Sequence, residues 1–315
     1  MNLQQLHYLC EVAKQGCNIT AASLALHTAQ SGISKQLKLF ENELGAQLFD
    51  RKGNRLCGLT PTGEKVLDSA RRVANEIEFI KRISQQIGSG DNGEITIATH
   101  HTPARYVLPN VLTRFRDLYP SVSVTLRHAS PEAILSLVKN GEVDFGVITT
   151  NANLDDGDLV ALPCHKFERI LIVPHGHALL QMRAPSLEAI CQYPLITYDV
   201  GFSGRAEILK TFKDAGLTPK LVLSVSDADV IKSCVEQGLG IAIVGCVIFD
   251  SNRDKGLNAI RINPLFPPAE MKIVLQQRHY FRKFDYDFIE TLSAKWHRAN
   301  VQMSATNRKF FVSSN

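Results

Sequence analysis

Apolar residues within the first 45 positions recur three and four residues apart, which predicts three short helices. Gly16 ends the first, Asn18 is a suitable N-cap for the second, and Gly45 ends the third. The apolar faces of the first and third helices are formed by Leu6, Leu9, Cys10 and Ala13, and by Ile33, Leu37, Phe40 and Leu44. Small residues such as Ala21 and Ala22 let two helices approach closely, so the pattern is typical of a helix-turn-helix.

The opposite face of the third helix is polar and basic, and short hydroxyls with long cations suit a helix in the major groove of DNA. An ordinary solvated face is the alternative. A hairpin follows with Gly53-Asn54 at its turn. Its cations fit a wing on the phosphate backbone, or they only make the turn soluble. The predicted DNA contacts are Gln30, Ser31, Ser34 and Lys35 in the groove, Lys38, Arg51 and Arg55 on phosphates, and Thr28 just before the helix.

A long helix is expected from Thr60-Pro61, an N-cap followed by proline at the first helical position, to about residue 87. Its apolar residues alternate spacings of four and three, which makes a heptad seam with one polar position. The seam is Val66, Ala70, Val73, Ile77, Ile80, Ser84 and Ile87. A narrow seam favours pairing with a second copy, and packing on its own domain is the alternative. Residues 88–93, rich in glycine, are expected to be a flexible hinge.

After residue 93, strand-like runs alternate with helical ones, which predicts an α/β fold with a largely parallel sheet. One series has strands at 95–98, 122–126 and 145–148, and a second begins near residue 170. A late strand at 271–276 and a closing helix at 284–296 complete the pattern. Two α/β lobes leave a cleft between them, which is a natural site for a small molecule. The polar tail, 301–315, is expected to be loose.

Composition and charge narrow the class of protein. The chain has 315 residues, 44% of them hydrophobic, and a net charge of +4, as expected for about two globular domains. DNA binding must therefore come from the local placement of cations. Seven scattered cysteines without a Cys-x-x-Cys pair indicate buried thiols and no zinc site. We find no membrane span or signal peptide, which points to the cytoplasm, and no metal, cofactor or catalytic motif. An enzyme on a two-lobed binding fold is the alternative from another class.

The N-terminal residues resemble the signature of the LysR-type transcriptional regulators. The resemblance rests on Thr20-Ala21-Ala22, Gln30-Ser31-Gly32-Ile33-Ser34-Lys35-Gln36-Leu37, Leu44-Gly45, Leu48-Phe49-Asp50-Arg51 and Leu59-Thr60-Pro61-Thr62-Gly63. Ser31 departs from the family, which usually has proline there. The resemblance implies a winged helix-turn-helix at 1–60, a dimerisation helix at 61–87 and a two-lobed, periplasmic-binding-protein-like effector domain at 94–300. Lobe I would be about 94–163 and 268–300, and lobe II about 164–267. Double-stranded promoter DNA and RNA polymerase are the implied partners.

The second half narrows the resemblance to the CysB/Cbl branch of that family. The similar segments are Gly93, Ile97-Ala98-Thr99, His101-Thr102, Ala104-Arg105-Tyr106, Leu162-Pro163-Cys164, Gly201-Phe202-Ser203-Gly204-Arg205 and Asp227-Ala228-Asp229-Val230-Ile231-Lys232. The branch implies a tetramer that controls sulfur assimilation or sulfonate use. It implies an effector such as N-acetylserine, O-acetylserine, sulfate or a related anion, bound by Thr102, Thr149 and Ser203.

Thr102 and Ser203 both lie at the start of an expected helix, where free N–H groups attract anions. The alternative is that they only cap their own helices. His100 replaces the usual threonine of the branch and Pro103 the usual glutamine, so a regulator of this family that senses an unrelated organic anion is a second possibility. We expect His100 to contact the anion with a charge that changes near neutral pH. Its neighbour His101 should point to the opposite side, so the pair does not suit one metal.

Overall fold

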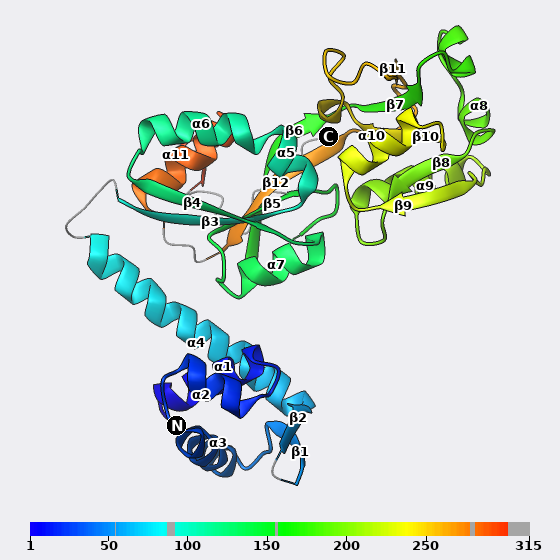
Figure 1. Cartoon of the computed structure of the whole chain (residues 1–315). Helices are drawn as coiled ribbons and strands as arrows, with labels where there is room; N and C mark the ends of the chain where they lie inside the picture. Colours follow the sequence, from blue (N-terminus) through cyan, green and yellow to red (C-terminus); the bar gives the residue numbers. More distant parts are fainter. Residues whose placement is uncertain (54, 87–91, 155–156, 278–280, 302–315) are drawn as a thin grey trace. The chain divides into compact units, whose positions relative to one another are not determined.

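The computed structural model describes residues 1–53, 55–86, 92–154, 157–277 and 281–301 (Figure 1). The chain divides into two compact units, which hold nearly all of residues 1–90 and of residues 91–315. No helix within the described ranges is long and apolar enough to cross a membrane. Most of the predicted hinge lies outside the described residues, and so do Ile87 of the seam and positions 302–315 of the tail.

The first unit is a winged helix-turn-helix, as predicted. Its elements are α1 (Leu3–Lys14), α2 (Ile19–Ala25), α3 (Gln30–Leu44) and a hairpin of β1 (Phe49–Lys52) and β2 (Arg55–Leu59). The Asn18 side chain accepts a hydrogen bond from the Ala21 amide, and Gly45 ends α3 in the left-handed conformation. Both caps confirm the helix boundaries inferred from the sequence. Leu9, Ile33 and Phe40 form the centre of the apolar core.

Helix α4 (Pro61–Gln86) begins as expected, with the Thr60 hydroxyl accepting a hydrogen bond from the Gly63 amide at 2.9 Å. The predicted seam does not behave as one strip. Val66 and Ala70 pack into the core of the first unit. Val73 and Ile80, further along, are 39% and 60% exposed. The start of the helix is therefore held by its own domain, and the exposed apolar residues lie beyond it.

The second unit contains two five-stranded sheets, one in each lobe (Figure 1). In the first lobe the strand order is β4-β3-β5-β12-β6, and in it β3 is parallel to β4 and β5 while β12 is antiparallel to β5 and β6. The bounds are β3 (Gly93–Thr99), β4 (Val122–His128), β5 (Phe145–Thr149), β6 (Leu159–Phe167) and β12 (Ala269–Gln276). The helices are α5 (His101–Tyr106), α6 (Leu108–Leu118), α7 (Pro131–Lys139) and α11 (Lys283–Leu292).

The second lobe has the strand order β11-β7-β10-β8-β9. Its strands are β7 (Arg169–Pro174), β8 (Leu195–Tyr198), β9 (Leu221–Val225), β10 (Ile241–Gly245) and β11 (Leu257–Arg261). Strand β8 is parallel to β9 and β10, whereas β7 is antiparallel to β10 and β11. The helices are η1 (Ala178–Gln181), α8 (Leu187–Cys191), α9 (Ser203–Asp214), α10 (Ala228–Glu236) and η2 (Cys246–Ile248). The two-lobed α/β fold is thus confirmed, although each sheet is mixed.

The chain crosses between the lobes twice. Strand β6 pairs with β12 as far as Phe167, and β7 of the second lobe begins at Arg169. The first crossover therefore lies after Phe167, a few residues later than the predicted boundary at 163/164. The reason is that β12 extends the ladder up to Ala269, a partner that lies far away in the sequence.

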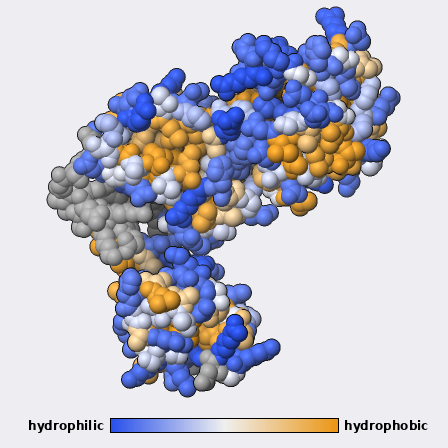
Figure 2. Space-filling view, in the orientation of Figure 1, coloured by the Kyte–Doolittle hydropathy of each residue, from blue (hydrophilic) through white to orange (hydrophobic). Residues whose placement is uncertain are grey.

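Two surface features complete the fold. All seven cysteines are unpaired, but Cys57 and Cys246 are exposed and the other five are only partly buried, so the expectation of buried thiols was wrong. Figure 2 shows hydrophobic patches on an otherwise hydrophilic surface, one of them over the region of β8, α9 and β9. Strand β9 is an edge of its sheet, and its Leu221 and Val222 are 37% and 42% exposed. The second unit thus exposes apolar side chains along its edge strand β9.

Candidate functional site

The structure places the predicted DNA contacts on α3 and on the hairpin of the first unit. Gln30, Ser31, Lys35 and Lys38 on α3, and Arg55 on β2, are exposed, and Thr28 and Ser34 are partly exposed. The buried positions of the same helix, Ile33, Leu37 and Phe40, fix which face is turned to solvent. A hydroxyl and cation surface therefore stands free on α3, next in sequence to a basic hairpin. The roles of these residues stay predictions.

Arg51 differs from the others because it is bonded within the unit. Its Nη2 lies 2.7 Å from Oε2 of Glu41 on α3, and Glu41 is only 7% exposed. The other oxygen of Glu41 accepts hydrogen bonds from the amides of Leu48 and Phe49 at 2.9 and 3.2 Å. Glu41 and Arg51 together fix the start of the hairpin to α3. The sequence indicated only a phosphate contact, because the partner of Arg51 lies ten residues earlier on another element.

A cavity that is partly open to solvent lies between the lobes of the second unit. All four residues predicted to bind the effector, His100, Thr102, Thr149 and Ser203, line it. They come from the ends of β3 and β5 and the starts of α5 and α9. The complete lining is His100, Thr102, Thr149, Phe167, Arg169, Tyr198, Phe202, Ser203, Gly204, Gly245, Val247, Ile248 and Ala269. Both lobes and both crossovers thus contribute to one cavity, as expected for a binding site between lobes.

The hydroxyls of Thr102 and Ser203 do not cap their own helices, so that alternative was wrong. The N-caps of α5 and α9 are His100 and Phe202, and neither helix has a side-chain cap. Ser203 Oγ instead donates to the backbone oxygen of Thr149 at 2.9 Å, and Thr102 is hydrogen-bonded to the hydroxyl of Tyr198. Both bonds join one lobe to the other. The N-terminus of α9, twelve residues long, is left with its positive dipole end at the cavity.

His100 is buried and uncharged. It is 6% exposed, and its Nε2 accepts a hydrogen bond from the Thr149 amide at 3.0 Å. Burial, and then the neighbouring His101 and His128, lower the pKa of His100 to about 4. Because a backbone amide can only donate, the ring proton sits on Nδ1. The expectation that the charge of His100 changes near neutral pH was therefore wrong, since burial disfavours the imidazolium.

Arg169 is a lining residue that the sequence analysis missed. It is 2% exposed, its Nη2 lies 2.5 Å from Oε2 of Glu207 on α9, and its Nε donates to the Pro267 oxygen at 3.1 Å. The buried Oγ1 of Thr149 has no hydrogen-bond partner among the residues that the structure describes. The cavity thus combines the Arg169 guanidinium, whose charge Glu207 neutralises, the unbonded hydroxyl of Thr149 and the N-terminus of α9. No local pattern marked Arg169, because it begins a buried strand and its partner is 38 residues away.

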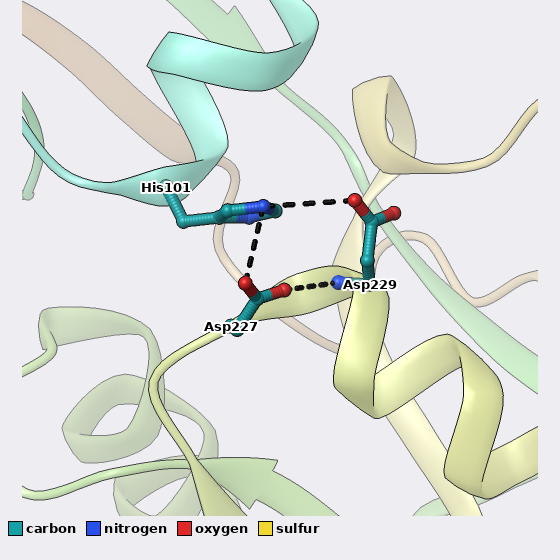
Figure 3. A group of neighbouring side chains, drawn as sticks. All are labelled: His101, Asp227 and Asp229. Atoms are coloured by element: carbon teal, nitrogen blue, oxygen red, sulfur yellow. Dashed lines mark hydrogen bonds and ion pairs between the residues drawn. The ribbon is translucent and has the colours of Figure 1, made fainter.

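His101 is the first residue of α5, not part of a strand as expected, and it faces α10 of the second lobe (Figure 3). Its Nε2 lies 3.2 Å from Asp227 Oδ2 and 3.6 Å from Asp229 Oδ2. The three side chains are close enough to hold one cation. However, Arg105 Nε and Lys232 Nζ already lie 3.2 and 3.3 Å from the Asp229 carboxylate. We therefore describe the group as an ion-pair network.

A winged helix-turn-helix followed by a two-lobed unit with an interlobe cavity defines a DNA-binding regulator that responds to a small molecule. Comparison with known families agrees. The bacterial regulatory helix-turn-helix of the lysR family matches residues 3–64, and the LysR substrate binding domain matches residues 88–296. The chain belongs to the LysR family of transcriptional regulators, and both matched families are parts of regulators, not of enzymes.

Several relatives match along almost the whole chain. The regulator SsuR of Burkholderia cenocepacia is 40% identical, over 96% of this chain and 97% of its own length. The regulator CysB of the same organism is 38% identical over 96% and 97%, and the Escherichia coli regulator Cbl 37% over 93% of each. Among solved structures, the cofactor-binding domain of Cbl has a TM-score of 0.65 at 36% identity and covers 68% of this chain and 93% of that one. Full-length OxyR C199D from Pseudomonas aeruginosa has a TM-score of 0.74 at 19% identity over 95% and 98%, which supports the fold alone.

Proposed function

We propose that this regulator controls genes of sulfur assimilation or sulfonate use in response to a small anion bound between the two lobes. The cavity carries the proposal, because Arg169, the free Thr149 hydroxyl and the start of α9 converge on it. The resemblance to the CysB/Cbl branch, together with relatives named SsuR, CysB and Cbl, supports the sulfur role. Thr102 and Ser203 are the further effector contacts in this proposal, and His100 is their neutral neighbour.

The charges of the cavity favour a singly charged organic effector over inorganic sulfate. Glu207 already neutralises Arg169, and His100 carries no charge at neutral pH. A sulfate dianion would leave two excess negative charges in the site, against one for a singly charged anion, and so has the higher desolvation cost. The apolar lining, which includes Phe167, Phe202 and Val247, suits an acyl group. N-acetylserine therefore ranks ahead of sulfate. The zwitterion O-acetylserine ranks below it because the lining residues given above include no carboxylate to pair with its ammonium group.

The test is calorimetric titration of the full chain with N-acetylserine, O-acetylserine, sulfate and a sulfonate. We expect N-acetylserine to bind with the highest affinity, and Thr149→Val to weaken it about tenfold, because one hydrogen bond to a charged group is lost. Thr113→Val is the matched control, since Thr113 is exposed on α6 and bonds only to its own helix at Pro109. No binding by any of the four compounds would refute the sulfur effector and favour an unrelated organic anion.

The remaining partners belong to the same proposal. Residues 1–60 form the DNA-binding head, in which Gln30, Ser34 and Lys35 read promoter DNA. Residues 61–87 form the dimerisation helix, and the exposed Val73 and Ile80 favour a partner helix on that part of α4. A tetramer and a contact with RNA polymerase rest on the family resemblance.

A further inference from the structure

Six side chains outside the cavity join α5 of the first lobe to α10 of the second. His101, Arg105 and Tyr106 come from α5, and Asp227, Asp229 and Lys232 from α10. Figure 3 shows the His101 ring facing both carboxylates. The cavity lining includes none of the six. We call this group the α5–α10 latch.

Asp229 is the centre of the latch. One of its oxygens accepts a hydrogen bond from the Tyr106 hydroxyl and lies 3.3 Å from Lys232 Nζ. The other lies 3.2 Å from Arg105 Nε and 3.6 Å from His101 Nε2. Three of these four partners belong to the opposite lobe. Burial raises the pKa of Asp229, but the hydrogen bonds from Tyr106 and Lys232 outweigh it and hold the pKa below its usual value. The carboxylate is therefore charged at neutral pH.

The second lobe holds its half of the latch in place. Asp227 is the N-cap of α10, where its Oδ1 accepts from the amide of Asp229 at 2.7 Å, and its other oxygen faces His101. Lys232 lies 3.0 Å from Asp254 Oδ1, donates to the Ile248 oxygen at 3.2 Å and stands 5.2 Å from the centre of the Tyr106 ring. Burial and the bond to Asp229 raise the pKa of Tyr106 to about 12, so its hydroxyl stays a donor. Asp227 and Lys232 are thus held in position by bonds within the second lobe, and the side chains of α5 contact them across the lobe boundary.

We propose that the α5–α10 latch holds the two lobes together and sets how readily they separate. The side chains of Arg105 and Asp229 are 60% and 36% exposed, so water competes for each bond and every single pair is weak. Several weak pairs acting together close the lobes and still allow them to open. The latch adds regulation to the proposed effector site, because the same two lobes that it joins form the walls of that cavity.

Hydrogen exchange of the full chain, measured by mass spectrometry without effector, tests the latch. Asp229→Asn keeps the shape of the side chain and removes its charge. We expect the amides of the first crossover, at 167–169, which border the cavity and bond to no member of the latch, to exchange three- to tenfold faster. Arg105→Gln changes an exposed residue on the opposite lobe. It should raise the exchange rates of the same amides by a smaller factor. High salt should speed exchange in the unmodified protein and have little effect in Asp229→Asn.

Asp214→Asn is the matched control, because its partner Lys210 lies one turn away on α9, at 2.5 Å, within a single lobe. It should leave the exchange of the cavity amides unchanged. Equal exchange in Asp229→Asn and Asp214→Asn, or no effect of Arg105→Gln, would overturn the proposal. Since no effector is present in this measurement, its result is independent of whether N-acetylserine binds.

Discussion

The exposed face of α3 and the cavity between the lobes are both polar sites, but they are built in opposite ways. On α3, Ser31, Lys35 and Lys38 stand in solvent. In the cavity, Ser203 is bonded to the Thr149 oxygen and His100 to the Thr149 amide. DNA meets a surface that is already free, whereas an effector that uses Ser203 as a donor has to replace a bond between the lobes.

This difference shows how a sensor can respond reversibly. A hydrogen bond within a protein contributes only about 1 kcal/mol net. The free energy lost when Ser203 releases the Thr149 oxygen is therefore nearly equal to the free energy gained when Ser203 bonds to the effector. The effector gains affinity from contacts that have no present competitor, such as the Thr149 hydroxyl. The same exchange removes a link between the lobes, and so couples occupancy of the cavity to lobe geometry.

The largest effect in the cavity is expected from Arg169→Met. It leaves the Glu207 carboxylate, 18% exposed, without its cation, so we expect the sensor to lose about 3 kcal/mol of unfolding free energy. The chain has a single tryptophan, Trp296, which is 5% exposed in the first lobe. Its fluorescence during urea unfolding reports on the sensor unit.

The double variant Arg169→Met with Glu207→Gln separates charge from packing. Without an unpaired carboxylate, most of the lost stability should return. If the single and double variants unfold at the same urea concentration, the pair acts through packing, and the contrast with the solvated cations of α3 disappears.

A second effect should appear only on acidification. His100 has a pKa of about 4 in the folded chain against an ordinary 6.5, so between these values the unfolded chain binds a proton that the folded chain does not. The stability of the sensor is complete above pH 6.5 and falls towards pH 4, by about 3 kcal/mol at most. Urea unfolding followed at Trp296 at pH 7, 5.5 and 4.5 measures this loss.

His100→Gln should remove that part of the pH dependence while keeping an acceptor for the Thr149 amide. The two proteins should therefore be closest in stability at pH 7, and the unmodified protein should lose stability relative to the variant as the pH falls towards 4. Parallel pH profiles for the two proteins would show that His100 is not the titrating group.

The smallest effects are expected on the DNA-binding unit, at the exposed Arg55 and the partly exposed Ser34. Arg55→Ala should weaken binding to every duplex and reduce the slope of log K against log salt by about 1. Ser34→Ala should cost about 1 kcal/mol on a duplex selected from a random pool and nothing on a scrambled one. Fluorescence anisotropy at several salt concentrations measures both, and an equal loss on both duplexes for Ser34→Ala would reject its role in the groove.

Local patterns in the sequence were sufficient to predict where the helices and strands lie, but not which of them contact one another. The caps Asn18 and Gly45 and the start of α4 at Pro61 all follow from residues within one turn of the position concerned. The position of the first crossover did not follow, because β6 is extended by pairing with β12. The exposure of Val73 likewise depends on where the core of the first unit ends.

The residue pattern alone predicted the winged helix-turn-helix and the two α/β lobes, and the resemblance to the CysB/Cbl branch pointed to the four positions that line the cavity. Periodicity, caps and motifs are properties of residues that are close in the sequence, so they can be recognised without the folded structure. Only the tertiary structure decided the partners of those positions: Ser203 and His100 meet Thr149 across 54 and 49 residues, and Arg169 meets Glu207 across 38. Burial and charge pairing depend on such distant neighbours, which is why the neutral state of His100, the role of Arg169 and the α5–α10 latch appeared only in the folded chain.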